Sequence, residues 1–292
     1  MATSGFQIGD ARIDKVLESV RASTPPKIMF PSYTPELLAR IAPATLDQIM
    51  TADRSALLTS SHSWLVRTPR HTILVDTGSG NAKNRPGFPI FHQLSNPYLE
   101  RLAAFDVAPE DVDFVLLTHL HADHVGWNTV LQDGAWRSTF PRAAYVFSEH
   151  EYRHYGDPQL GDPLAGEVIA DSVRPVVDAG QAVMVGPGPF DPIPGIFFRP
   201  TPGHTVDHFS IELKSHGQTA IFAGDVMHSA LQVYAPAWHS QYCEDSGRAL
   251  TSRNWLLDYV AEREALYLST HFQGPSAGRI GRTANGFVWT YA

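Results

Sequence analysis

The chain has 292 residues, of which 43% are hydrophobic and 18% charged, an ordinary mixture for a globular protein with a sizeable core. Its net charge of −8 disfavours nucleic acid as a partner, because phosphate binding relies on clustered lysine and arginine. No stretch reaches the roughly 20 apolar residues of a membrane span, and the first residues lack the basic and apolar regions of a secretory signal, so we expect a cytoplasmic protein with no membrane partner. The single cysteine, Cys243, excludes an intramolecular disulfide.

Short strands and helices are expected to alternate along the chain. Within residues 1–40 only 34–40 favour a helix, and the remainder could form an extended N-terminal arm. A helix is expected from Asn96, which suits an N-cap, with Pro97 at the first helical position. The other predicted elements are strands at 63–68, 71–76, 112–118, 143–147, 195–200, 208–213, 219–225 and 265–270, and helices after Ser148 and at 248–264.

This order of elements predicts an α/β fold with two sheets and helices outside them. No segment rich in glycine, serine or proline separates the elements, so residues 1–292 are predicted to form a single domain. The N-terminal arm, residues 1–40, could pack either on a partner subunit or on its own chain.

The sequence HLHADH, residues 119–124, directly follows the apolar strand predicted at 112–118. In extended chain His119 and His121 point to the same side, whereas Asp123 and His124 follow where the chain turns. One turn cannot direct all of these side chains at a single ion. The motif therefore favours two neighbouring metal ions.

Further candidate ligands follow other predicted strands. His204 lies in PGHT, Asp225 in AGD with His228 three residues later, and His271 in STH. Each has a glycine or proline nearby, where the backbone can turn sharply. Taken alone, each residue is more commonly a cap or a hydrogen-bonded polar group. Together with HLHADH, they predict a metal site built from distant segments.

These motifs, together with Asp76 in ILVDTGSG, resemble the metallo-β-lactamase superfamily over roughly residues 55–275. The resemblance implies an αβ/βα four-layer sandwich of two mixed sheets with a two-metal site at one edge. It also implies that Asp225 bridges the two ions and that Asp76 orients a ligand histidine. The implied ligands are His119, His121 and His204 for one ion, and Asp123, His124 and His271 for the other.

Nitrogen and oxygen ligands without a thiolate suit zinc, and they also suit iron, cobalt and manganese. We expect two divalent ions, with zinc as the preferred identity. Two ions about 3.5 Å apart can share a water and make it a hydroxide near neutral pH, which would attack a carbonyl or phosphoryl centre. Asp225 and Asp123 are the expected catalytic residues, Asp225 as the bridge and Asp123 as a carrier of a proton to the leaving group.

Within the superfamily, the sequence is most similar to the acyl-homoserine lactonases and the methyl-parathion-hydrolase-like enzymes, through HLHADHVGWN and WRSTFPRAAYVFSEHEY. That branch implies hydrolysis of a lactone or related ester, with organophosphate triesters or aryl esters as the alternative. A β-lactam is less expected, because the best-known zinc β-lactamases carry a cysteine where Asp225 stands. The sequence GDVMH after the bridge disfavours a glutathione thioesterase, and the acidic charge disfavours a nuclease. The complete ligand set disfavours a non-catalytic metal-binding module.

Several other residues have both a functional and a structural interpretation. His228 could bind substrate or support the fold, and Tyr145 or Tyr234 could stabilise an oxyanion. The loop at 84–96 either covers the mouth of the site or is an ordinary surface connection. The branch also implies a homodimer. Aromatic residues that could line an apolar pocket, although core packing is the commoner role of any single one, are Phe88, Phe91, Trp127, Trp238 and Phe272.

Overall fold

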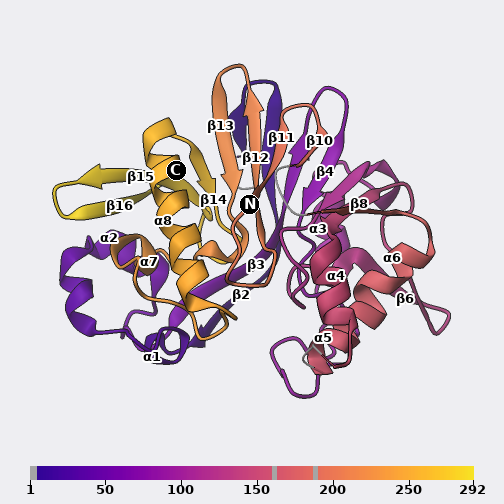
Figure 1. The fold of residues 1–292 in the computed structure, drawn as a ribbon, viewed down its shortest axis with the longest axis horizontal. Helices are drawn as coiled ribbons and strands as arrows, with labels where there is room; N and C mark the ends of the chain where they lie inside the picture. Colours follow the sequence, from indigo (N-terminus) through magenta and orange to yellow (C-terminus); the bar gives the residue numbers. More distant parts are fainter. Residues whose placement is uncertain (1–4, 160–162, 187–189) are drawn as a thin grey trace. The chain divides into compact units, whose positions relative to one another are not determined.

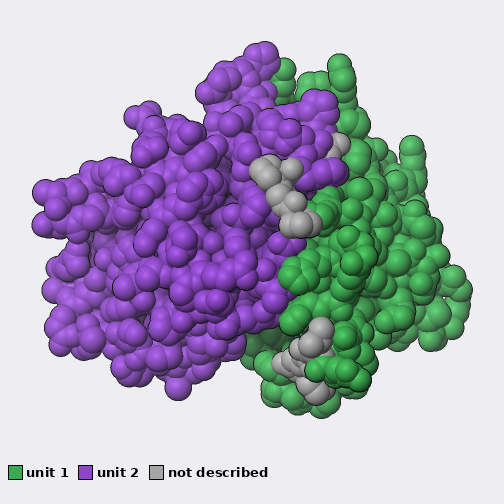
Figure 2. Space-filling model, in the orientation of Figure 1, with its two compact units in different colours: residues 1–19, 61–188 green, residues 20–60, 189–292 purple. Residues whose placement is uncertain are grey.

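The computed structural model describes residues 5–159, 163–186 and 190–292. The chain divides into two compact units (Figures 1 and 2). Unit 1 consists of Met1–Ser19 and Ser61–Gly188, and unit 2 consists of Val20–Ser60 and Pro189–Ala292. Each unit has its own hydrophobic core and carries part of the predicted ligand set.

Unit 1 contains most of a seven-stranded sheet with the order β1-β2-β3-β4-β5-β8-β9. Its strands β4, β5, β8 and β9 pair in parallel, whereas β1 with β2 and β3 with β4 pair antiparallel. Strands β6 and β7 form a separate antiparallel pair. The strands are β1 (Phe6–Ile8), β2 (Ala11–Thr24), β3 (Leu57–Arg67), β4 (Thr72–Val75), β5 (Phe114–Leu116), β6 (Thr129–Gln132), β7 (Ala135–Ser138), β8 (Ala144–Ser148) and β9 (Ala182–Val185).

The helices of unit 1 cover this sheet and close its core (Figure 1). Leu74, Val115 and Phe147 from the parallel strands pack with Tyr98 and Tyr155 from the helices, and all of these side chains are buried. The helices are α3 (Tyr98–Ala103), α4 (Glu149–Gly156), α5 (Pro163–Val168), the π-helix η4 (Ile169–Val173), α6 (Arg174–Asp178) and the short 3-10 helices η2 (Pro109–Asp111) and η3 (Gly126–Asn128).

Unit 2 contains the second seven-stranded sheet, in which the strands follow one another in sequence order from β10 to β16. Only β13 and β14 pair in parallel, so this sheet is also mixed. Its strands are β10 (Phe190–Ile193), β11 (Ile196–Pro200), β12 (Phe209–Ser215), β13 (Gln218–Phe222), β14 (Leu266–Leu268), β15 (Ala277–Thr283) and β16 (Gly286–Tyr291). Its helices are α1 (Pro26–Met29), η1 (Pro35–Arg40), α2 (Pro43–Ile49), η5 (Gly224–Val226), α7 (Leu231–Tyr234) and α8 (Ser246–Arg263).

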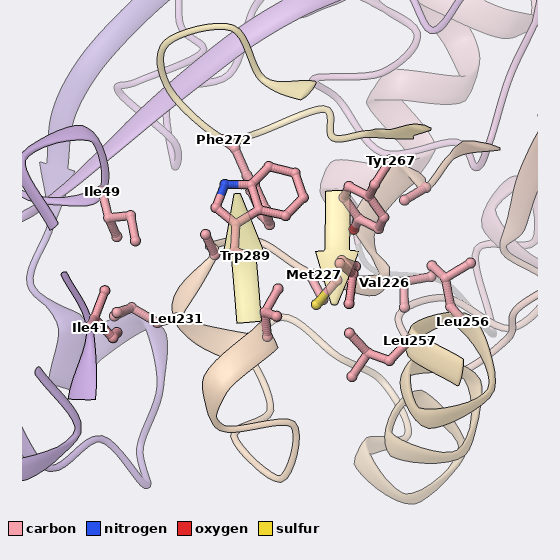
Figure 3. Close-up of a cluster of buried hydrophobic side chains, with 14 of the residues drawn as sticks. Ile41, Ile49, Val226, Met227, Leu231, Leu256, Leu257, Tyr267, Phe272 and Trp289 are labelled. Atoms are coloured by element: carbon pink, nitrogen blue, oxygen red, sulfur yellow. The ribbon is translucent and has the colours of Figure 1, made fainter. Parts of the chain in front are cut away.

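An aromatic cluster forms the centre of the core of unit 2 (Figure 3). Trp289 meets Tyr267 and Phe272 edge-on, with ring centroids 5.6 and 5.3 Å apart, a favoured aromatic geometry. Leu256 and Leu257 from α8 pack into the same cluster. Helix α8 thus covers the sheet that carries the ligand segments of this unit.

The predicted α/β class, with two mixed sheets and helices, is confirmed. The possible N-terminal arm needs correction, since residues 6–8 and 11–24 form β1 and β2 of the first sheet. The alternation of β2 is hidden in the sequence because Asp14, Lys15 and Glu18 are charged and nevertheless buried. The prediction of a single domain stays a prediction.

Two smaller expectations shift by a few residues. Helix α3 begins at Tyr98 with Pro97 as its N-cap and has no side-chain cap, because proline carries no hydrogen-bonding side chain; the backbone N–H of Asn96 donates to Asn81 Oδ1 at 2.8 Å. Strand β5 ends at Leu116, since the next parts of the chain turn away to form the loop of HLHADH.

In the described parts of the chain, no helix combines the length and apolar character that crossing a bilayer requires.

Candidate metal centre

Asp76 and His124 contact each other in the ligand loops of unit 1. Because β4 and β5 are parallel neighbours, the residues that follow them, Asp76 and HLHADH, leave the sheet at the same edge. Asp76 Oδ1 accepts a hydrogen bond from the Thr118 N–H at 2.8 Å, and Oδ2 lies 2.9 Å from His124 Nδ1. A carboxylate at Nδ1 favours the tautomer that presents Nε2 as a metal ligand.

The remaining side chains of HLHADH gather around His124. The ring centroid of His119 lies 4.6 Å from that of His121 and 3.9 Å from that of His124. The Asp123 carboxylate reaches within 3.9 Å of His124 Nε2. From α4, Glu151 Oε2 accepts the backbone N–H of Leu120 at 2.8 Å and so holds the loop between the first two histidines. Unit 1 therefore brings together all the ligand residues that the sequence placed in this motif.

Asp225 is the centre of the ligand set in unit 2. Its Oδ2 lies 3.3 Å from Nε2 of both His204 and His228, and its Oδ1 lies 3.1 Å from His271 Nε2. Ligand atoms of His204, Asp225 and His228 lie within 4.8 Å of one another. The carboxylate thus stands between imidazole nitrogens that a shared cation could connect.

Three backbone contacts hold this arrangement in place. Asp225 lies in η5, directly after β13, and its N–H donates to His208 Nε2 at 2.9 Å. His271 Nδ1 lies 3.2 Å from the Ser60 carbonyl oxygen, which leaves Nε2 directed at Asp225. Buried Arg253 on α8 donates from Nε to the Val226 carbonyl oxygen at 2.9 Å. Each contact fixes a ligand or its immediate neighbour.

The donor set of both units fits a zinc-type cation. Imidazole nitrogen and carboxylate oxygen are ligands of zinc and of other divalent transition metals. Cys243 Sγ lies 3.9 Å from Nδ1 of His204, the ring nitrogen opposite the one that faces Asp225. The union of the two sets into one two-metal centre stays a prediction.

The two candidate oxyanion tyrosines have structural contacts. Tyr145 is buried, and its hydroxyl donates to the Asn128 carbonyl oxygen and accepts the Phe140 N–H. Burial raises the pKa of Tyr145. The Tyr234 hydroxyl contacts the backbone of Trp289. Both hydroxyls therefore support the fold.

Most of the candidate pocket aromatics also belong to cores. Trp127 stacks on Tyr98 at 5.0 Å in unit 1, and Phe272 lies in the core of unit 2. Phe91 and Trp238 pack against these cores from partly buried positions. Phe88 is exposed, on the loop at 84–96.

The sequence did not reveal Glu18, His208 and Arg253 as residues that support the ligand loops, because their partners are distant in the chain or outside the recognised motifs.

Comparison with known proteins places these ligands in a family context. Residues 57–271 match the sequence model described as the Metallo-beta-lactamase superfamily. Among curated proteins, a hydroxyacylglutathione hydrolase of Aeromonas salmonicida is 30% identical over 171 residues, which is 59% of this chain and 48% of that protein. The match thus spans about half the length of that relative.

Solved structures resemble the chain over nearly its whole length. AbOPH, a hydrolase in the β-lactamase superfamily, has a TM-score of 0.82 at 25% identity, with 100% of this chain and 97% of that chain covered. AidC, described as a dizinc quorum-quenching lactonase, has a TM-score of 0.78 at 19% identity, with 99% and 97% covered. At that identity the second likeness shows the fold alone.

Proposed function

Since the chain belongs to the metallo-β-lactamase superfamily, we propose that it is a metal-dependent hydrolase that opens a lactone or a related ester. The observation that carries the proposal is the convergence of His204, His228 and His271 on the Asp225 carboxylate. The complete HLHADH motif supports it, because its rings gather in the same way within unit 1.

We assign two zinc ions to this centre, held by the ligands that the sequence motifs specify. When bound, such ions supply an activated water and polarise the attacked group. Asp225 would be shared by the two ions, and Asp76 keeps His124 in the tautomer that would bind one of them. Asp123 carries a proton to the leaving group. His228 contacts the same oxygen of Asp225 as His204, and we assign it to steady that carboxylate.

Two other substrate classes remain candidates. The Aeromonas relative, named a hydroxyacylglutathione hydrolase, favours a thioester. The resemblance to methyl-parathion-hydrolase-like enzymes favours an organophosphate triester. The proposed partners are a small ester substrate and a second copy of the chain, with neither nucleic acid nor membrane.

The test combines elemental analysis of the purified protein with a substrate panel. The panel contains acyl-homoserine lactones, aryl esters, paraoxon-type triesters, a hydroxyacyl-glutathione thioester and a chromogenic β-lactam. We expect two metal ions per chain and the highest kcat/KM on a lactone or ester. A preference for the thioester would make a thioester, not a lactone, the assigned substrate. Metal-loaded protein that cleaves no member of the panel would refute the proposal that the chain is a hydrolase.

The bridging role of Asp225 gives the first mutational prediction. Asp225→Asn should lower the bound metal by at least one ion per chain and reduce kcat by about a hundredfold or more, since even an outer-sphere partner is worth 10–100-fold. Asp258→Asn, at a half-exposed carboxylate on α8, is the matched control and should change neither quantity. Two bound ions and full activity in Asp225→Asn would contradict the bridge.

A further inference from the structure

Glu18 on β2 is a buried carboxylate that none of the metal motifs explains. Its side chain is 1% exposed and lies outside residues 57–271, the part of the chain that matches the family. It accepts hydrogen bonds from the backbone N–H of Ser79 at 2.9 Å, from that of Gly80 at 3.0 Å and from Trp127 Nε1 at 2.8 Å. A buried carboxylate with three donors is costly to remove and specific in what it holds.

The donors belong to two loops that are already interlocked through their backbones. The Thr77 N–H donates to the His124 carbonyl oxygen at 2.7 Å, and the Trp127 N–H donates back to the Thr77 carbonyl oxygen at 2.9 Å. A Cβ at Gly126 would lie 1.9 Å from the Ser79 carbonyl carbon, so only glycine permits this approach. The loop after Asp76 and the loop after His124 are therefore held against each other by their backbones.

The Glu18 carboxylate supplies the acceptor oxygens for the N–H groups of these two loops. Gly78 and Gly80 both have positive φ, 58° and 76°, and the backbone amides of Ser79 and Gly80 point at one carboxylate. Successive amides in such a turn form a concave site for an anion. The backbone of β2 at Glu18 is fixed as well, because Arg101 donates to the carbonyl oxygens of Leu17 and Glu18 at 2.8 and 2.7 Å.

We propose that Glu18 is a positioning residue for the metal ligands of unit 1, an inference that rests on the proposed function. Glu18 anchors the two loops, the loops fix the backbones of Asp76 and His124, and Asp76 in turn orients the His124 ring. Loss of the carboxylate would leave every ligand present but would widen the range of positions that His124 samples. Metal affinity, rather than ligand number, should therefore fall.

The test is Glu18→Gln, which keeps the side-chain volume but turns one oxygen that accepts into an amide that donates. Zinc affinity is measured by competition with a chromogenic chelator, and amide hydrogen exchange at Ser79 and Gly80 is measured in metal-free protein. We expect about tenfold weaker zinc binding, at the lower end for outer-sphere partners. We also expect faster exchange at both amides.

Glu212→Gln is the matched control, because Glu212 is a buried carboxylate on β12 that bonds Arg199 and carries no ligand loop. It should lower thermal stability while leaving zinc affinity unchanged. If Glu18→Gln fails to fold, Trp127→Phe removes the Nε1 donor while keeping an aromatic ring beside Tyr98, and it should still weaken zinc binding. Unchanged zinc affinity in a folded Glu18→Gln protein overturns the inference. A wild-type protein that binds no zinc refutes the proposed function instead, and exchange at Ser79 and Gly80 still decides whether Glu18 holds the loop.

Discussion

The Nδ1 atoms of several predicted ligand histidines meet oxygen atoms. His124 meets the Asp76 carboxylate, His119 meets the Thr118 hydroxyl at 3.0 Å, and His271 meets the Ser60 carbonyl oxygen. A neutral imidazole that donates from Nδ1 has its lone pair on Nε2. These contacts prepare the rings for a cation before any cation binds.

Asp76→Asn tests this preparation directly. Asp76 has a φ of 54°, which asparagine tolerates well, so the backbone should be preserved. The new amide can present an N–H to His124 Nδ1 and so favour the tautomer whose Nε2 carries a proton. We expect zinc affinity to fall by about 10–100-fold, measured by chelator competition. Thr118→Val, which removes only the hydroxyl contacts, should cost less, and equal affinity in Asp76→Asn and wild type would contradict the argument.

The sequence located helices and strands best where the signal is local, such as an apolar run or a short capping motif. The apolar run before HLHADH predicted β5, and the spacing of Ser148 and Glu151 predicted the start of α4, where Ser148 Oγ accepts the Glu151 N–H at 3.1 Å. Strand β2 was hidden by its buried charges, whose partners are far away in sequence. Arg67, for example, pairs with Asp14 at 2.7 Å across more than fifty residues. Local periodicity cannot reveal such pairs.

The same limit applies to the candidate site. The candidate ligands outside HLHADH could be located in the sequence, because His204, Asp225 and His271 follow predicted strands with a glycine or proline nearby. Glu18 and Arg253 could not, because their roles depend on backbone groups that only the folded chain brings to them. His208 lies four residues after His204, yet its contact is with the N–H of Asp225, on another strand end.

The π-helix η4 anchors the base of the loop at 84–96 through a cluster of buried charges. Arg85 donates to both carboxylate oxygens of Asp171 at 2.8 and 2.7 Å. Lys83 Nζ donates to Thr129 Oγ1 at 2.6 Å and lies 3.5 Å from the centroid of the Trp136 ring. Lys83 Nζ also lies 3.7 Å from Asp171 Oδ1, so two cations share one carboxylate, and burial lowers the pKa of Lys83 to about 7.

This depressed pKa predicts that stability rises with pH. Between pH 7 and 9 the unfolded chain keeps the Lys83 proton while the folded protein releases it, so the unfolded state binds more protons and the free energy of unfolding increases. From pH 7 to 9 the gain is about 2 kcal/mol. Urea unfolding of metal-free protein at pH 7, 8 and 9 measures it, and Lys83→Met should show a flatter dependence. Lys15, whose pKa burial also lowers to about 7, is present in both proteins and cancels in the comparison. Parallel pH profiles for the two proteins would refute the effect.

For the molecule as a whole, the chain joins its two units in an unusual way. Domain boundaries commonly fall in exposed linkers. Here one boundary lies between Ser19 and Val20 within β2, and another lies between Ser60 and Ser61 within β3. When one end of such a strand unfolds, the pairing of its other end, which belongs to the other unit, loses neighbouring hydrogen bonds. If these shared strands couple the two cores, residues 1–292 should unfold cooperatively, as a single domain requires.

Leu257→Ala tests this cooperativity. Leu257 is fully buried in the core of unit 2, and its truncation should cost about 2–5 kcal/mol of unfolding free energy. If unfolding is cooperative, native-state hydrogen exchange should show an equal loss of protection in β13 of unit 2 and in β5 of unit 1. Leu117→Ala, in the core of unit 1, is the reciprocal control and should give the same pattern. A loss confined to the unit that carries the substitution would show that the two cores unfold separately, and the chain would then contain two domains.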